Sequence, residues 1–132
     1  MKVEWLDRAL FVSSHHYCLC TNEKQFHAAL KHLHIQREHY PDFVLHKHSD
    51  ATVHYLESGD GLKHSAIVCL RVREGIEGTQ IAALLVHEAV HIWQATKKDY
   101  GEKEPSSELE AYAIQNIAQR LMESYAEQIK EK

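Results

Sequence analysis

The residues with the clearest chemical potential form the pattern His87-Glu88-Ala89-Val90-His91. Side chains four residues apart in a helix lie on one face, so both imidazoles can reach a single Zn²⁺. Glu88 lies about 100° around the helix from His87, where its carboxylate can address a metal-bound water rather than the metal. The spacing therefore predicts a zinc site at His87 and His91, with Glu88 beside it.

The residues around this pattern predict a buried helix. Between Ile81 and Trp93, every residue except the two histidines and Glu88 is apolar, and a helix that is apolar on all sides is usually buried. Two imidazoles and a carboxylate cost roughly several kcal/mol in such a place unless they are paired or bound to metal. The alternative to a metal site is a structural pair of hydrogen-bonded histidines beside a surface glutamate.

A third metal ligand is expected farther along the chain. No histidine follows His91, and Gln94 and Lys97 stand where a His-x-x-Gly-x-x-His continuation would need glycine and histidine. A downstream ligand must then be a carboxylate, and Glu108 and Glu110 lie at the start of the next expected helix. Two histidines and one glutamate leave a fourth position for water, which is the catalytic arrangement of zinc.

His87-Glu-Ala-Val-His91 followed by Glu108-Leu-Glu-Ala111 resembles the gluzincin metallopeptidases, in particular their smallest single-domain members, the minigluzincins. The resemblance covers roughly residues 52–128. It implies that His87, His91 and Glu108 bind zinc and that Glu88 is the general base of peptide-bond hydrolysis. One position departs from the family pattern, because Tyr112 stands where a polar group that orients a ligand is usual.

The choice between Glu108 and Glu110 stays open at this point, with Glu108 preferred. Glu110 lies nearer the apolar centre of its expected helix, whereas Glu108 lies on the flank, where an open cleft belongs. Ser107-Glu-Leu-Glu110 also matches a capping box, which would occupy Glu110 with the backbone.

Hydrolysis also needs a donor to the developing oxyanion, and the sequence does not choose among four candidates: Tyr100, Tyr112, His54 and His64. From the resemblance alone, the strand His64–Arg71 is expected to bind an extended peptide along its edge.

Several other histidines and cysteines invite attention. His15-His-Tyr-Cys18-Leu-Cys20 places four potential ligands in six residues, but two nearby cysteines more often fill a core. His32 and His34, and likewise His46 and His48, read as histidines of a surface helix and a loop. Cys69 would suit a deformylase-like His₂Cys site, although the other signatures of that family are missing.

The elements that must position these residues predict one α+β domain spanning residues 1–132. A strand is expected over about 9–20, a helix from Thr21 or Asn22 to about Arg37, and two strands over Thr52–Glu57 and His64–Arg73 around a turn at 58–61. Thr79 is the expected N-cap of a helix running to about Thr96, and Pro105-Ser-Ser107 opens a last helix ending near Lys130. We expect a small, mostly antiparallel sheet with one N-terminal and two long C-terminal helices.

Composition limits the function further. The chain has 132 residues, 44% of them hydrophobic, and a formal net charge of −4, which gives no electrostatic footprint for nucleic acid or an anionic membrane. Three cysteines without a Cys-x-x-Cys pattern and a charged N-terminus favour a cytoplasmic protein with free thiols. The prediction is a zinc-dependent peptidase acting on a peptide or protein, and the rival is a non-catalytic binding module that retains the zinc site.

Overall fold

The structure is a computed structural model, and it describes residues 3–6, 15–46, 48–56 and 64–130. Long helices follow a small sheet, as the sequence predicts. In chain order the elements are β1 (His15–Cys20), α1 (Glu23–His32), a short 3₁₀ helix (Arg37–His39), β2 (Ala51–Leu56), β3 (His64–Leu70), α2 (Gly78–Asp99) and α3 (Ser107–Lys130). The α+β class is confirmed.

The sheet is mixed, which corrects the prediction of a mostly antiparallel sheet. Its strand order is β1-β3-β2, with β1 parallel and β2 antiparallel to β3. The local sequence pattern identifies strands but not their partners, and here β3 pairs on both sides. β3 is therefore the central strand, which contradicts the prediction that it offers an edge to a peptide.

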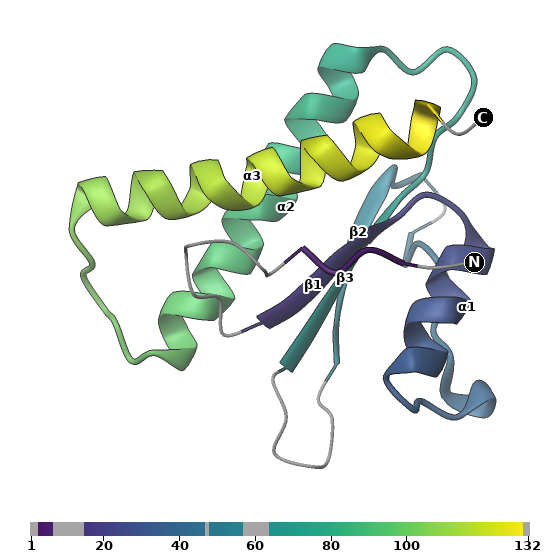
Figure 1. The fold of residues 1–132 in the computed structure, drawn as a ribbon, viewed down its shortest axis with the longest axis horizontal. Coiled ribbons are helices and arrows are strands. Elements are labelled where there is room, and N and C mark those ends of the chain that lie inside the picture. Colours follow the sequence, from purple (N-terminus) through teal and green to yellow (C-terminus); the bar gives the residue numbers. More distant parts are fainter. Residues whose placement is uncertain (1–2, 7–14, 47, 57–63, 131–132) are drawn as a thin grey trace.

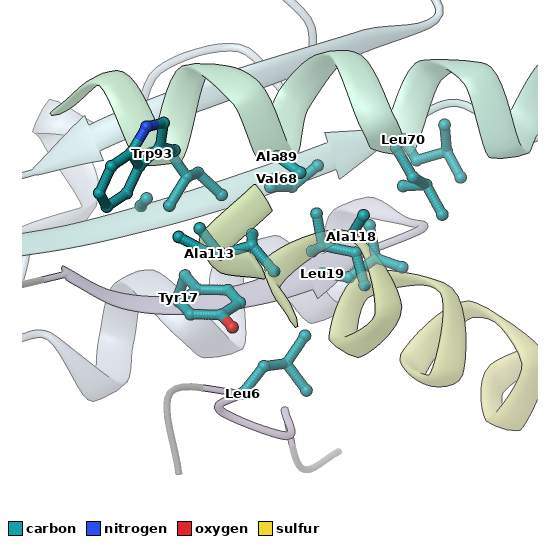
Figure 2. Close-up of a cluster of buried hydrophobic side chains, with 14 of the residues drawn as sticks. Leu6, Tyr17, Leu19, Val68, Leu70, Ala89, Trp93, Ala113 and Ala118 are labelled. Carbon is teal, nitrogen blue, oxygen red and sulfur yellow. The ribbon is translucent and has the colours of Figure 1, made fainter. Parts of the chain in front are cut away.

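Helices cover both faces of the sheet (Figure 1). Helix α1 packs on one face against β1 and β3, while α2 lies over β2 and α3 over β1 on the other face. The larger buried cluster joins the sheet to α2 and α3 through side chains such as Leu19, Val68 and Ala118 (Figure 2). A smaller cluster under α1 contains Phe26, Leu30 and the three cysteines.

The observed helix caps explain where α1 and α2 begin. Of the two predicted caps, Thr21 and Asn22, it is Asn22 that caps α1: its side-chain oxygen accepts a hydrogen bond from the backbone nitrogen of Gln25 at 2.9 Å. Helix α2 begins with a capping box between Glu77 and Gln80 instead of the predicted cap at Thr79. Position 77 is Glu, which is not among the preferred N-cap residues Ser, Thr, Asp and Asn, so that preference favoured Thr79 instead.

Helix α3 begins at Ser107 and ends at Lys130, as predicted. Its expected capping box is absent: the backbone nitrogen of Leu109 donates to the hydroxyl of Ser106 at 3.2 Å, so the cap lies one residue earlier. The strand expected over 9–20 is described only from His15 onward, and the turn at 58–61 lies outside the described residues. In the part of the chain that the structure describes, no helix is both long and apolar enough to cross a membrane.

Candidate metal centre

Helix α2 presents the His-Glu-x-x-His pattern at the side facing β2. Its core face is made of Ile81, Leu85, Ala89, Ile92 and other buried residues. His87 and His91 lie on the other side and are exposed, as the helical wheel predicts. The helix is not buried on all sides, since Val86 is 40% exposed, and the histidine pair therefore opens to solvent instead of lying in the core.

The two imidazoles face each other across one helical turn. The Nε2 atoms of His87 and His91 are 3.2 Å apart, with their ring planes inclined at 77°. Two nitrogens that each lie 2.0–2.1 Å from one tetrahedral zinc are about 3.3 Å apart. The pair is thus preformed for a shared zinc ion without any change in the positions of the ligating nitrogens.

A hydrogen bond that His91 donates to Gln94 determines which ring nitrogen of His91 can face a metal. The Nδ1 atom of His91 lies 2.9 Å from the side-chain oxygen of Gln94. An amide oxygen only accepts, so Nδ1 carries the proton and the neutral ring keeps its lone pair on Nε2. Such a partner on the second ring nitrogen orients metal-binding histidines. Gln94 therefore orients the His91 ring, a role that Tyr112 cannot fill at the position where the family has a polar group.

A cleft adjoins the histidine pair. One hollow of about 350 Å³ lies between β2, the loop before it and α2, and His87, Glu88, His91, Tyr55 and His46 are among the residues that line it. A second hollow of about 550 Å³ lies along α2 and shares Ser49, Ala51, His87 and Glu88 with the first. His87 and Glu88 line both hollows, and His91 lines the first.

Glu88 lies at the floor of this cleft and is 6% exposed. Burial raises the pKa of its carboxyl above the ordinary value, and the imidazoles of His87 and His91 oppose that shift. A carboxylate with a raised pKa beside a cleft is a candidate general base. The structure places Glu88 beside the histidine pair, as the sequence predicts.

Tyr55 is a further functional candidate, which is not among the residues predicted from the sequence. It lines the cleft with Glu88, and burial together with the negative charge of Glu88 raises the pKa of its phenol to about 12. The hydroxyl therefore keeps its proton at neutral pH and can donate a hydrogen bond. Because side chains alternate along a strand, Tyr55 lies on the same face of β2 as Val53. The sequence does not show that α2, with its two histidines, packs over this face.

The four predicted oxyanion donors do not line the cleft. His54 is buried on the face of α1, where it stacks on Phe26 and bonds to the carbonyl oxygen of Phe43 at 2.9 Å. His64, Tyr100 and Tyr112 are exposed elsewhere: at the start of β3, at the end of α2 and on α3, respectively.

Neither predicted carboxylate lies with the histidine pair. Glu108 is exposed on the first turn of α3. The carboxylate of Glu110 accepts a hydrogen bond from the indole of Trp93 at 2.7 Å and pairs with Lys97 at 3.3 Å. These donors lower the pKa of Glu110 and hold it against another face of α2. Among the described residues, no three His, Cys, Asp or Glu side chains are placed to hold a metal ion.

The histidines and cysteines of segment 15–20 and Cys69 have structural roles. His15 is buried and lies 3.7 Å from Asp99, while Cys18 and Cys20 lie on one strand face, as alternation predicts, in the apolar cluster under α1. Cys69 belongs to the same cluster and so lies across the sheet from α2, which rules out a His₂Cys site with the histidine pair.

No known protein family, curated protein or solved structure matches this chain. The resemblance to gluzincins therefore depends on the sequence motifs alone.

Proposed function

We propose that the protein is a zinc-dependent peptidase whose metal is bound by His87 and His91. The observation that carries this proposal is the 3.2 Å separation of the two Nε2 atoms, with the Nδ1 of His91 held by Gln94. The two rings share a hydrogen bond at this distance, and the same separation suits two nitrogens on one zinc ion, which takes the place of the shared proton. The Gln94 contact orients the His91 ring as partners of metal-binding histidines do.

The remaining residues of the cleft suit hydrolysis. When bound, zinc supplies a water acidic enough to lose a proton near neutral pH and polarises the scissile carbonyl. Glu88 takes the proton of the attacking water and returns it to the leaving amine. Tyr55 donates a hydrogen bond to the carbonyl oxygen as negative charge develops there.

A peptide or protein is the proposed substrate. β2 is an outer strand of the described sheet and borders the cleft, so an extended segment can pair with its backbone and present a peptide bond to Glu88. Glu108 stays the sequence-based prediction for the third ligand, and it has no hydrogen bond or ion pair with another described residue that would compete for its carboxylate.

The variant Glu88→Gln tests the function. It keeps the size of the side chain but removes the base, so it should bind zinc like the wild type and lose cleavage of a peptide library by at least about 10²-fold. Glu74→Gln, a surface change after β3, is the matched control and should cleave normally. Full cleavage by Glu88→Gln would contradict the proposal. Zinc binding without cleavage by the wild type would instead favour the non-catalytic module.

A further inference from the structure

A third histidine, His46, is among the residues that line the cleft, whereas neither predicted carboxylate lines it. His46 lines the same hollow as His87, Glu88 and His91. It comes from the loop before β2, forty-one residues ahead of His87 in the sequence. Sequence order alone gives no reason to connect this loop with α2, and only the packing of α2 over β2 brings them to one cleft.

The backbone around His46 is held on several sides. The carbonyl oxygen of His46 accepts hydrogen bonds from the backbone of Ser49 at 3.0 Å and from the guanidinium of Arg71 at 3.4 Å. The preceding residue, Leu45, donates its backbone N–H to the hydroxyl of Thr52 in β2 at 3.3 Å. These contacts attach the loop to β2 and to Arg71, the residue that follows β3.

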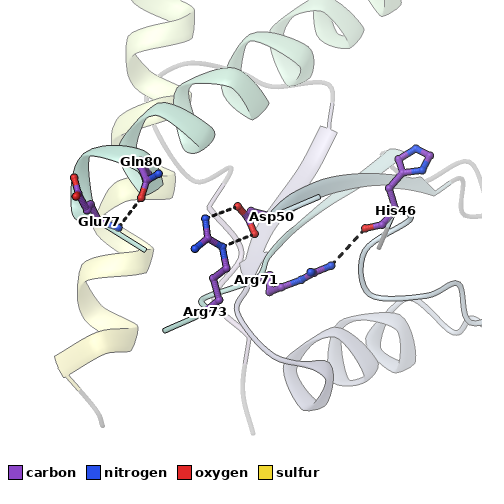
Figure 3. Close-up of polar contacts among 6 residues, drawn as sticks. All are labelled: His46, Asp50, Arg71, Arg73, Glu77 and Gln80. Carbon is purple, nitrogen blue, oxygen red and sulfur yellow. Dashed lines mark hydrogen bonds and ion pairs between the residues drawn. The ribbon is translucent and has the colours of Figure 1, made fainter. Parts of the chain in front are cut away.

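The imidazole itself is left exposed. Figure 3 shows the His46 carbonyl turned toward Arg71, with the ring on the other side of the chain. The side chain is exposed and has no ring contact or hydrogen bond with another described side chain. An exposed ring of this kind changes rotamer on a picosecond to nanosecond timescale. As placed, the three histidines do not form a metal-binding group among the described residues, so the His46 ring has to change rotamer to join a metal bound by His87 and His91. A held backbone with an exposed imidazole suits such a ligand.

The chemistry of the donor set agrees with this assignment. Three neutral imidazoles bind zinc and leave one position open, which is a known catalytic arrangement. The carboxylate of Glu110 is occupied by Trp93 and Lys97, and Glu108 does not line the cleft. We propose that His46 is the third protein ligand of the metal centre, in the place that the sequence pattern assigns to Glu108. This inference rests on the proposed function, since it needs the zinc site at His87 and His91.

The test is a zinc titration of the intact protein against a chromophoric chelator, with Co²⁺ absorption as a second readout. His46→Ala should weaken zinc binding by more than about 100-fold, because losing even a hydrogen-bond partner of a ligand costs 10–100-fold. The same variant should change the visible spectrum of the Co²⁺-loaded protein. His48→Ala is the matched control, since His48 is an exposed histidine of the same loop that does not line the cleft, and it should bind both metals like the wild type.

Glu108→Gln completes the set and separates the two ligand assignments. Unchanged zinc affinity in Glu108→Gln together with weak binding by His46→Ala supports the proposal. Wild-type affinity and an unchanged Co²⁺ spectrum in His46→Ala would overturn it, whatever Glu108→Gln does. A wild-type protein that binds neither metal would instead refute the zinc site itself. Circular dichroism of each variant shows whether the loop change has altered the fold.

Discussion

At the scale of single residues, the proton on His91 is the clearest preparation for metal binding. The Gln94 oxygen accepts that proton at Nδ1 and leaves Nε2 to the metal. Gln94→Leu should weaken zinc binding by 10–100-fold, because the ring loses both its preferred tautomer and its orientation. Gln115→Leu, an exposed change on α3, should have no such effect. Equal zinc affinity for both variants in a chelator competition would show that Gln94 does not prepare the site.

Tyr55 makes a second prediction at this scale. Its hydroxyl is protonated at neutral pH and lies in the cleft with Glu88. Tyr55→Phe should lower kcat for a cleaved peptide by about 10²-fold with little change in KM, because the lost hydrogen bond acts on the developing oxyanion. Zinc affinity should not change. Tyr40→Phe, next to α1, is the control; a loss confined to KM in Tyr55→Phe would indicate a substrate-binding role instead.

At the scale of elements, α2 and α3 depend on each other for their position. Ile117 of α3 is fully buried in the cluster that joins both helices to the sheet. Ile117→Ala should lower the free energy of unfolding by about 2–5 kcal/mol in urea denaturation, through lost burial and the cavity left behind. Ile129→Ala, where the side chain is 46% exposed, should change it by less than about 0.5 kcal/mol. Similar losses for the two variants would mean that the α2–α3 packing is wrong.

The elements also show why sequence reasoning succeeded in part. The apolar spacing of α2 and α3 predicted their existence and core faces, because a helix repeats its side-chain directions every 3.6 residues. The pairing of β1 with β3 was not predictable in this way, since its partners lie about 49 residues apart in the sequence (His15 with His64). The capping-box prediction at Ser107 failed because Trp93 and Lys97, which lie on another helix, hold the carboxylate of Glu110.

The residues of the candidate site also differ in whether a local sequence pattern could predict them. His87, Glu88 and His91 lie on one helix, so a local pattern was enough to predict their grouping. Tyr55 and His46 reach the cleft only through the packing of α2 over β2, and no local pattern marks them. Residues contributed by a distant loop or strand need the three-dimensional arrangement before their role is visible.

At the scale of the whole molecule, stability should fall in mildly acidic solution through His15. Burial lowers the pKa of His15 below its ordinary value of 6.5; Asp99 of α2 opposes this shift and His64 of β3 adds to it. Tyr55 of β2 contacts the ring edge-on. The unfolded chain therefore takes up the proton more readily, so this stabilisation is present above about pH 6.5 and is lost as the pH falls through the lower, folded pKa.

His15→Gln removes this titration. Between pH 7 and pH 5, the wild type should lose more unfolding free energy than His15→Gln does, with a difference in slope of at most about 1.4 kcal/mol per pH unit. His32→Gln, an exposed histidine of α1, should follow the wild-type curve. Parallel curves for wild type and His15→Gln in urea titrations would contradict the assignment.

The central claim concerns one metal ion and two nitrogen atoms. Anomalous diffraction at the zinc absorption edge, from crystals grown with one equivalent of Zn²⁺, locates that ion directly. The account predicts a single strong peak between α2 and β2, about 2.0–2.1 Å from the Nε2 atoms of both His87 and His91. Crystals that show no zinc peak there, with the two rings still bonded to each other, would contradict it.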